Sequence, residues 1–107
     1  MTTVPLPDLE RLNRLYTAGF RDAFLDSALH KIVERQAARD EADLQRVTQH
    51  LRELEAQYGL TSDEFFKQYQ AGQLADTADF TEWSAYCKLR QRIMQRQHIL
   101  QAEAPHD

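Results

Sequence analysis

Residues 63–89 read DEFFKQYQAGQLADTADFTEWSAYCKL, and this stretch decides the fold. Five of the ten aromatic residues of the chain lie between Phe65 and Trp83, and Tyr86 follows one turn later. Aromatic side chains bury a large area each, so a cluster of this density predicts the main packing centre of a small protein. We expect the remaining helices to pack against it, while leaving open whether part of the cluster is exposed as an interface.

Two helices are marked out within and beside this stretch. Thr61 and Glu64 have the spacing of a capping box, which predicts a short helix from Ser62 to about Ala71, closed by Gly72. Residues 73–78 then form a connector. Asp79, followed three residues later by Glu82, predicts the cap of a final helix of about 24 residues.

A long helical segment precedes the aromatic stretch. Neither Gly nor Pro occurs from Phe20 to Tyr58, and Gly59 suits the left-handed position just after a helix. In its second half, apolar residues recur at spacings of three and four, which predicts a single apolar seam along the helix where a second helix packs. The apolar pattern thins over residues 36–43, QAARDEAD, so either one long helix or a hairpin that breaks near Arg39 is consistent with it; we favour continuity because the segment has no turn residue. The seam residues are Leu44, Val47, Leu51, Leu54 and Tyr58.

The N-terminal third predicts a further amphipathic helix. Pro5 and Pro7 favour an extended lead over residues 1–7. The helix that follows this lead contains Gly19, which lowers helix stability. We therefore expect either a break in the helix at Gly19 or a neighbouring element packed closely against its bare backbone. Residues 104–107 are expected to fray. The apolar residues of this helix are Leu9, Leu12, Leu15, Tyr16, Phe20 and Phe24.

Composition bounds the class of protein. The chain has 107 residues with three Gly and three Pro, is rich in helix formers and contains no convincing strand pattern, which predicts a single all-α domain over residues 1–107. We expect a helical bundle with one long central helix or helical hairpin, a short aromatic helix and a long C-terminal helix. The net charge of -4 argues against a dedicated duplex-DNA binder.

No pattern typical of catalysis occurs. Asp22, Asp26, His30 and Glu34 are four apart and form one stripe on a helix, which we interpret as a solvated acidic face rather than a metal site. Cys87 is interpreted as a buried, inert thiol because free cysteine is among the most buried residue types. Phosphate loops, nucleophile elbows and paired metal-ligand motifs are missing from the sequence. We therefore expect no enzyme activity, no cofactor and no metal.

Charge reverses across the start of the last predicted helix. Lys88, Arg92 and Arg96 are four apart and form a basic ridge, with no acidic residue from Trp83 to Ala102. The ridge suits solvent, an internal or intersubunit ion pair, an acidic partner, or the phosphates of a nucleic acid. Contact with nucleic acid is the third-ranked function that we consider.

The aromatic stretch also resembles a known class of small helical bacterial proteins. The resemblance rests on residues 63–89, with Phe65, Tyr69, Gly72, Leu74, Asp79, Phe80, Glu82, Trp83 and Tyr86 as the matching positions. Those proteins look like antitoxin-type partners encoded beside small toxins. The resemblance implies a neutraliser of a protein partner, although this chain lacks the strand or helix-turn-helix that precedes the helical part in DNA-binding antitoxins.

From these observations we predict a non-enzymatic binding protein that sterically occludes a protein partner, which the resemblance suggests is a toxin. The alternative is a homodimeric helical scaffold. Residues 1–10 resemble no secretory signal, and no segment is apolar enough to span a bilayer, so we expect a cytoplasmic protein without membrane contact. The predicted partner-binding residues are Leu51, Phe66, Tyr69, Trp83 and Tyr86.

Overall fold

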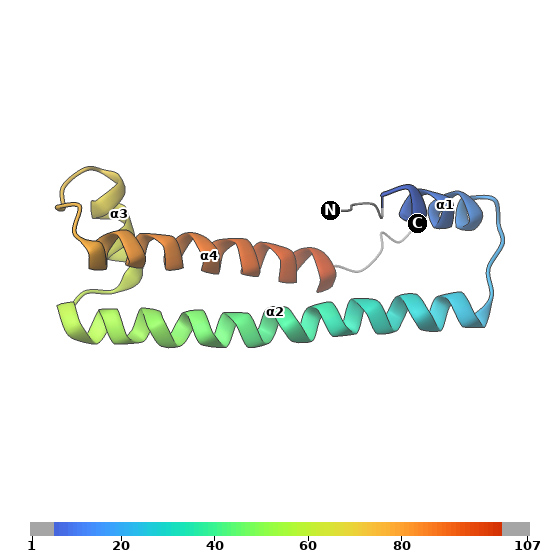
Figure 1. Cartoon of the computed structure of the whole chain (residues 1–107), viewed down its shortest axis with the longest axis horizontal. Coiled ribbons are helices and arrows are strands. Elements are labelled where there is room, and N and C mark those ends of the chain that lie inside the picture. The colour runs from blue at the N-terminus through green and yellow to red at the C-terminus, as the bar shows by residue number, and fades with distance from the viewer. Residues whose placement is uncertain (1–5, 102–107) are drawn as a thin grey trace. The chain divides into compact units, whose positions relative to one another are not determined.

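The computed structural model describes residues 6–101, which contain four helices and no strand. The helices are α1 (Leu6–Thr17), α2 (Ala23–Tyr58), α3 (Ser62–Gln70) and α4 (Ala78–Gln101) (Figure 1). The predicted all-α class, with a long central helix, a short aromatic helix and a long C-terminal helix, is confirmed. The chain forms two compact units, Met1–Glu34 and Arg35–Asp107, and the boundary between them falls within α2. None of the described helices has the length and apolar character needed to cross a bilayer.

Helix α2 passes through residues 36–43 without a break, which confirms continuity over a hairpin. The local reason is composition, because QAARDEAD consists of residues that tolerate or favour helix. The helix ends at Tyr58, where Gly59 adopts a φ of +64° and donates its N–H to the carbonyl of Glu55 at 2.8 Å. This is the predicted left-handed C-terminal glycine.

In the first unit, the predicted N-terminal helix is interrupted at Gly19. This residue has a φ of +93°, and among the described atoms nothing lies within 4 Å of where a side chain would begin. The glycine therefore serves the turn and not close packing. After the turn, the Asp22 carboxylate accepts the N–H of Leu25 at 2.8 Å and caps the start of α2. Tyr16 donates to Asp26 at 2.6 Å and ties the two helices together.

The predicted ends of the chain are only partly described. An extended lead over residues 1–7 is wrong for its last two positions, because α1 begins at Leu6. Pro7 fits there because the first turn of a helix needs no N–H donor from it. The remaining residues of the lead, 1–5, and the predicted frayed tail, 104–107, lie outside the described residues.

In the second unit, α4 runs antiparallel to the C-terminal part of α2 (Figure 1). Arg96 bonds to Asp40, and Tyr86 stacks on His50. The contact residues of α2, Asp40 and His50, are ten positions apart, and so are their partners on α4, Arg96 and Tyr86, in the opposite chain direction. The register between the two helices does not slip over this length. The buried seam of α2 is formed by Val47, Leu51 and Leu54, with Leu44 partly buried beside it, as predicted. Tyr58, the fifth predicted seam residue, is instead 39% exposed, and its ring packs against the edge of the core at Phe80 and Trp83.

Helix α3 crosses the start of α4 and completes the core. Phe65 and Trp83 are both fully buried, with ring centroids 4.0 Å apart and ring planes 2° from parallel. The Trp83 indole N–H donates to the Ser62 hydroxyl at 2.9 Å, so its one polar atom is satisfied inside the core. On the exposed side of α3, Arg90 pairs with Asp63 at 3.0 Å.

One helix cap is as predicted and one is different. Thr61 accepts the N–H of Glu64 at 3.2 Å, which confirms the cap of α3. The predicted cap of α4, Asp79, is wrong, because α4 begins at Ala78 and the Thr77 hydroxyl accepts the N–H of Phe80 at 3.1 Å. Asp79 instead accepts a hydrogen bond from the Tyr58 hydroxyl, a contact that the sequence spacing alone does not reveal.

Candidate functional site

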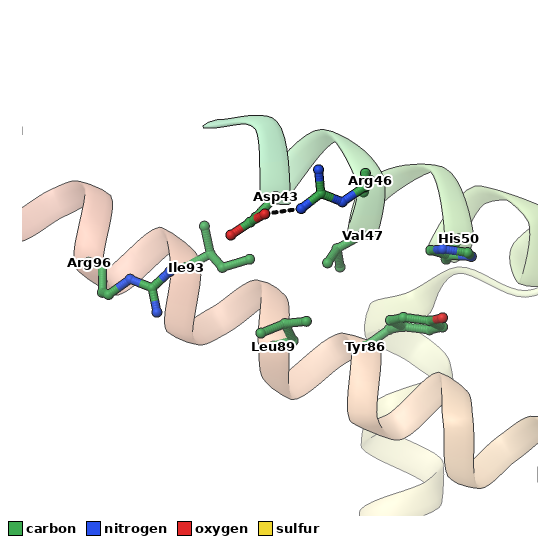
Figure 2. Close-up of a pocket in the computed structure, with 8 residues that line it drawn as sticks. All are labelled: Asp43, Arg46, Val47, His50, Tyr86, Leu89, Ile93 and Arg96. Atoms are coloured by element: carbon green, nitrogen blue, oxygen red, sulfur yellow. Dashed lines mark hydrogen bonds and ion pairs between the residues drawn. The ribbon is translucent and has the colours of Figure 1, made fainter. Parts of the chain in front are cut away.

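An open groove of about 410 Å³ lies between α2 and α4 in the second unit, and we call it the α2–α4 groove (Figure 2). Three apolar side chains form its floor: Val47 from α2, and Leu89 and Ile93 from α4. Val47 and Ile93 are buried, whereas Leu89 is 39% exposed. The other lining residues are Asp43, Arg46, His50, Tyr86 and Arg96.

Two different stripes of α4 explain why this groove stays open. Trp83, Cys87 and Arg90 recur at helical spacing and contact α3 through Ser62 and Asp63. Tyr86, Leu89 and Arg96 lie on another stripe and line the groove. Since α3 occupies the first stripe, neither it nor any other helix of residues 35–101 fills the groove.

A stacked pair of rings closes one end of the groove. The rings of His50 and Tyr86 have centroids 4.6 Å apart and planes 4° from parallel. Burial raises the pKa of the Tyr86 hydroxyl, and the nearby Glu82 carboxylate raises this pKa further. The phenol is therefore neutral at physiological pH and has no role as a base.

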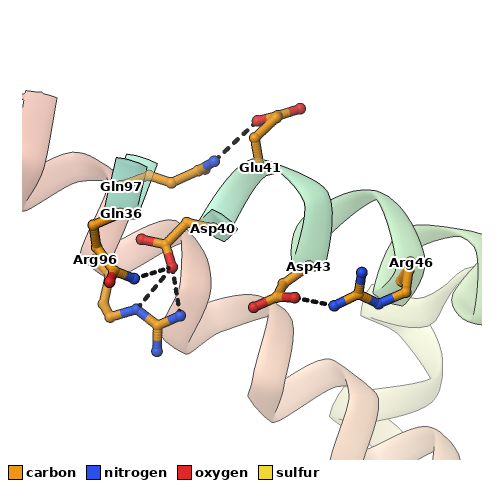
Figure 3. A network of polar contacts seen from close by, with 7 residues as sticks. All are labelled: Gln36, Asp40, Glu41, Asp43, Arg46, Arg96 and Gln97. Atoms are coloured by element: carbon orange, nitrogen blue, oxygen red, sulfur yellow. Dashed lines mark hydrogen bonds and ion pairs between the residues drawn. The ribbon is translucent and has the colours of Figure 1, made fainter. Parts of the chain in front are cut away.

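A polar network lies at the other end (Figure 3). The Asp40 side chain is fully buried and accepts hydrogen bonds from Gln36 at 3.1 Å and from Arg96 at 2.6 and 3.2 Å. Beside it, Gln97 donates to Glu41 at 3.0 Å, and Arg46 pairs with Asp43.

All the donors to Asp40 converge on one of its oxygens. The second carboxylate oxygen, Oδ2, has no hydrogen-bond partner among the described atoms. The Arg96 guanidinium holds the pKa of the Asp40 carboxyl below its usual range, against the opposing effect of burial. Asp40 is therefore a charged group that α4 holds in place, and it was not among the residues predicted from the sequence. The sequence gave no signal that Asp40 is buried, because charged residues are mostly exposed, although Asp40 lies four residues before Leu44, the first residue of the α2 seam.

Two of the predicted partner-binding residues lie in the core. Trp83 is 0% exposed and Leu51 is 2% exposed, so neither offers surface to a partner in this fold, and the prediction is corrected for both. The physical reason is that α3 folds over the start of α4 and encloses the aromatic cluster. Phe66 and Tyr69 are partly buried against that core, and Tyr86 lines the groove.

The predicted basic ridge is divided by its contacts. Arg96 belongs to the buried network, although its side chain is 45% exposed. Lys88 and Arg92 are exposed, and neither forms an ion pair with another described residue. Contact of this ridge with phosphate or an acidic partner stays a prediction.

The stripe of Asp22, Asp26, His30 and Glu34 in the first unit makes contacts with nearby residues of the same unit. Asp22 caps α2, Asp26 accepts from Tyr16, and His30 lies 3.1 Å from the Glu34 carboxylate. Within residues 6–101 the structure shows no group of three or more His, Cys, Asp or Glu side chains placed to hold a metal ion. Tyr16 has its pKa raised to about 12, chiefly because its hydroxyl donates to Asp26.

Cys87 is buried as predicted, at 1% exposure. Burial raises the pKa of its thiol to about 11, and the Arg90 side chain offsets this only in part. Since a thiolate is the reactive form, this cysteine does not have the character of a nucleophile.

The first unit exposes apolar residues that the sequence pattern assigned to a packed face. Phe24 is 79% exposed, Phe20 65%, Ile32 63% and Leu9 61%. No described residue of this unit is buried. The physical reason is size, because a unit that ends at Glu34 is shorter than the roughly 40 residues that a chain usually needs to enclose a core of its own.

Comparisons with known proteins add no relative to this description. No family model matches the chain, no curated protein matches it, and no solved structure matches it. The antitoxin-like resemblance of residues 63–89 therefore stays a prediction that rests on the quoted residues alone.

Proposed function

We propose that this chain is a non-enzymatic binding protein, and that its partner covers the exposed apolar side chains of residues 6–34. One observation carries the proposal. The buried core residues all belong to the second unit, while Leu9, Phe20, Phe24 and Ile32 in the first unit are more than half exposed. Large apolar side chains that are this exposed, on a unit with no buried core among its described residues, are candidates for a protein interface.

The magnitude of the effect supports this proposal. Full burial of one Phe or Ile side chain stabilises by about 1.5–3 kcal/mol. Four large apolar side chains left in water therefore represent a gain that folding does not realise, and it is comparable in size with the stability of a typical folded protein, about 5–15 kcal/mol. A partner surface that covers them would gain this free energy, less the cost of association.

The mechanism that we propose is steric occlusion of the partner. The second unit acts as a folded base, because its aromatic cluster is enclosed by α2, α3 and α4. The narrower form of the proposal is neutralisation of a small toxin, as the resemblance implies. The recognition surface then differs from the one predicted from sequence, since Phe20 and Phe24 replace Trp83 and Leu51.

The test is capture of partners by the full chain and by the variant Phe24→Glu with Ile32→Glu. Asn13→Glu with Ala18→Glu is the matched control, because it introduces the same two negative charges at exposed positions of the same unit, outside the hollow beside Phe24, without removing a large apolar side chain. We expect a stoichiometric protein partner that the control retains and the apolar variant loses at unchanged thermal stability. Equal capture by all three proteins would contradict the proposal, and growth rescue on coexpression tests whether the partner is a toxin.

A homodimer is the second candidate, and a specific feature of α2 favours it. Phe24 borders a hollow of about 390 Å³ that it shares with Ala23, Ser27, Ala28 and Lys31. An exposed ring and a hollow on the same face suit a two-fold interface, in which Phe24 of each copy enters the hollow of the other copy.

Sedimentation of the chain over a range of concentrations separates the two candidates. A dimer that dissociates in Phe24→Glu, with no other protein captured, favours the scaffold. Ala28→Leu fills the hollow and should weaken this dimer about tenfold or more, because one leucine displaces the incoming ring. Leu51→Glu is unsuitable as a probe because Leu51 is buried, and a charge placed there should unfold the second unit whether or not the chain dimerises.

A further inference from the structure

We propose that the α2–α4 groove is a second binding surface, and that it docks an acidic amphipathic helix of another protein. One apolar side chain of that helix enters the hollow over Val47, Leu89 and Ile93 (Figure 2). This surface is built wholly from residues of the second unit.

The apolar part of the inference comes from the packing of two helices. α2 and α4 contact each other along one seam, and α3 covers only the stripe that contains Trp83 and Cys87. On the groove side, Leu89 remains 39% exposed above the otherwise buried Val47 and Ile93. A third helix laid along this seam would complete a three-helix bundle and cover Leu89.

The charged residues around the groove determine the charge of the helix that can bind there. Arg46 and Arg96 line the groove, and both are already paired, Arg46 with Asp43 and Arg96 with Asp40. Arg92 is three residues after Leu89 and therefore lies beside it on the surface of α4. Arg92 forms no ion pair with another described residue, so a carboxylate of a helix that packs over Leu89 can reach an unpartnered cation.

Two other occupants fit less well. A second copy docked through the same face would bring Arg92 of each chain toward the arginines of the other. A nucleic acid would gain the phosphate contacts but leave the apolar floor unused, and the chain as a whole has a net charge of -4. An acidic helix uses both the floor and the cations.

The test uses a labelled 18-residue helical peptide with Leu at every third and fourth position on one face and Glu on its flanks. Fluorescence anisotropy is measured with the full chain, and amide shifts of the isotope-labelled chain locate the contact. We expect binding that shifts Val47, Leu89 and Ile93 and weakens with added salt. A peptide with Lys in place of Glu should bind at least about tenfold more weakly, because it meets like charge.

Variants of the chain give the decisive comparison. Leu89→Glu should weaken binding about tenfold or more, and Arg92→Glu about fivefold. The controls are Met94→Glu and Arg52→Glu, which make the same changes at exposed positions that do not line the groove. Phe24→Glu should bind the peptide normally, whichever partner covers residues 6–34.

Several results would overturn the proposal. They are equal binding of the Glu and Lys peptides, shifts confined to residues 6–34, or equal losses in the groove variants and their controls. A single-stranded oligonucleotide that binds more tightly than the peptide, and that Arg92→Glu abolishes while Leu89→Glu does not, would assign the ridge to nucleic acid. Concentration-dependent dimerisation lost only in Leu89→Glu would assign the groove to a second copy.

Discussion

Arg96 on α4 donates two hydrogen bonds to a single carboxylate oxygen of Asp40 on α2, from Nε at 3.2 Å and from Nη2 at 2.6 Å (Figure 3). The two partners differ in their access to water. The Asp40 side chain is 0% exposed, whereas that of Arg96 is 45% exposed. A buried charge depends on its partner far more than a half-exposed charge does, so the two halves of this contact should respond differently to substitution.

Arg96→Met should therefore lower the urea midpoint more than Asp40→Asn does. In Arg96→Met, a buried carboxylate loses its counter-charge and two donors, whereas in Asp40→Asn the guanidinium turns to solvent. Circular dichroism during urea titration at pH 7 measures both. Arg92→Met is the control, because Arg92 makes no ion pair with a described residue and should change little. A larger effect of Asp40→Asn than of Arg96→Met would contradict this account.

The same contact should make stability fall in acid. Its Arg96 hydrogen bonds lower the pKa of Asp40 in the folded state, so the charged carboxylate stabilises the fold above its usual pKa range. That stabilisation is lost as the pH falls below about 4 and through the lowered pKa. The urea midpoint of the parent protein should drop more between pH 6 and pH 3 than that of Asp40→Asn. Parallel pH profiles of the two proteins would rule out this role for Asp40.

Ser62→Ala should destabilise the second unit by about 1–3 kcal/mol, because it leaves the buried indole N–H of Trp83 without an acceptor. Trp83 is the only tryptophan of the chain, so its fluorescence reports unfolding directly. Ser27→Ala serves as a control at an exposed serine. If both variants unfold at the same urea concentration, the Trp83–Ser62 hydrogen bond has no net effect on stability.

Thr77→Ala should cost about 1 kcal/mol, because it removes the acceptor for the N–H of Phe80 at the start of α4. Thr77→Ser keeps the hydroxyl and should retain most of that stability. Thermal unfolding of the three proteins gives the comparison. A stable Thr77→Ala protein would return the capping role to Asp79, as the sequence spacing predicts.

Cys87 should react about a hundredfold more slowly with a thiol reagent at pH 8 than an exposed cysteine does, because its pKa is raised to about 11 and little thiolate is present. Its burial should slow the reaction further. Labelling in 6 M urea should restore the ordinary rate, which is the control for reagent and sample. Rapid labelling of the folded protein would show that α3 opens from α4.

Short sequence patterns were sufficient to predict helix ends, where the conformation and hydrogen bonding of the local backbone decide the structure. Gly59 and Gly72 end α2 and α3 with φ values of +64° and +75°, and Thr61 caps α3. These features depend on neighbouring residues only, and the sequence displays them directly. The α4 cap shows the limit of such patterns, because Thr77 and Asp79 both suit an N-cap and only one can occupy the position.

The all-α class and most of the buried α2 seam thus followed from the sequence, since helix propensity and spacings of three and four are properties of the chain itself. The sequence favoured a continuous α2 but left a hairpin near residues 36–43 open. Tertiary structure decided the rest. Packing of α3 on α4 placed Trp83 in the core and not on a surface, the antiparallel register brought Arg96 to Asp40 across the hairpin, and the same packing left the α2–α4 groove open. The periodicity of a helix shows which side chains share a face, but only the placement of other helices determines whether that face is buried.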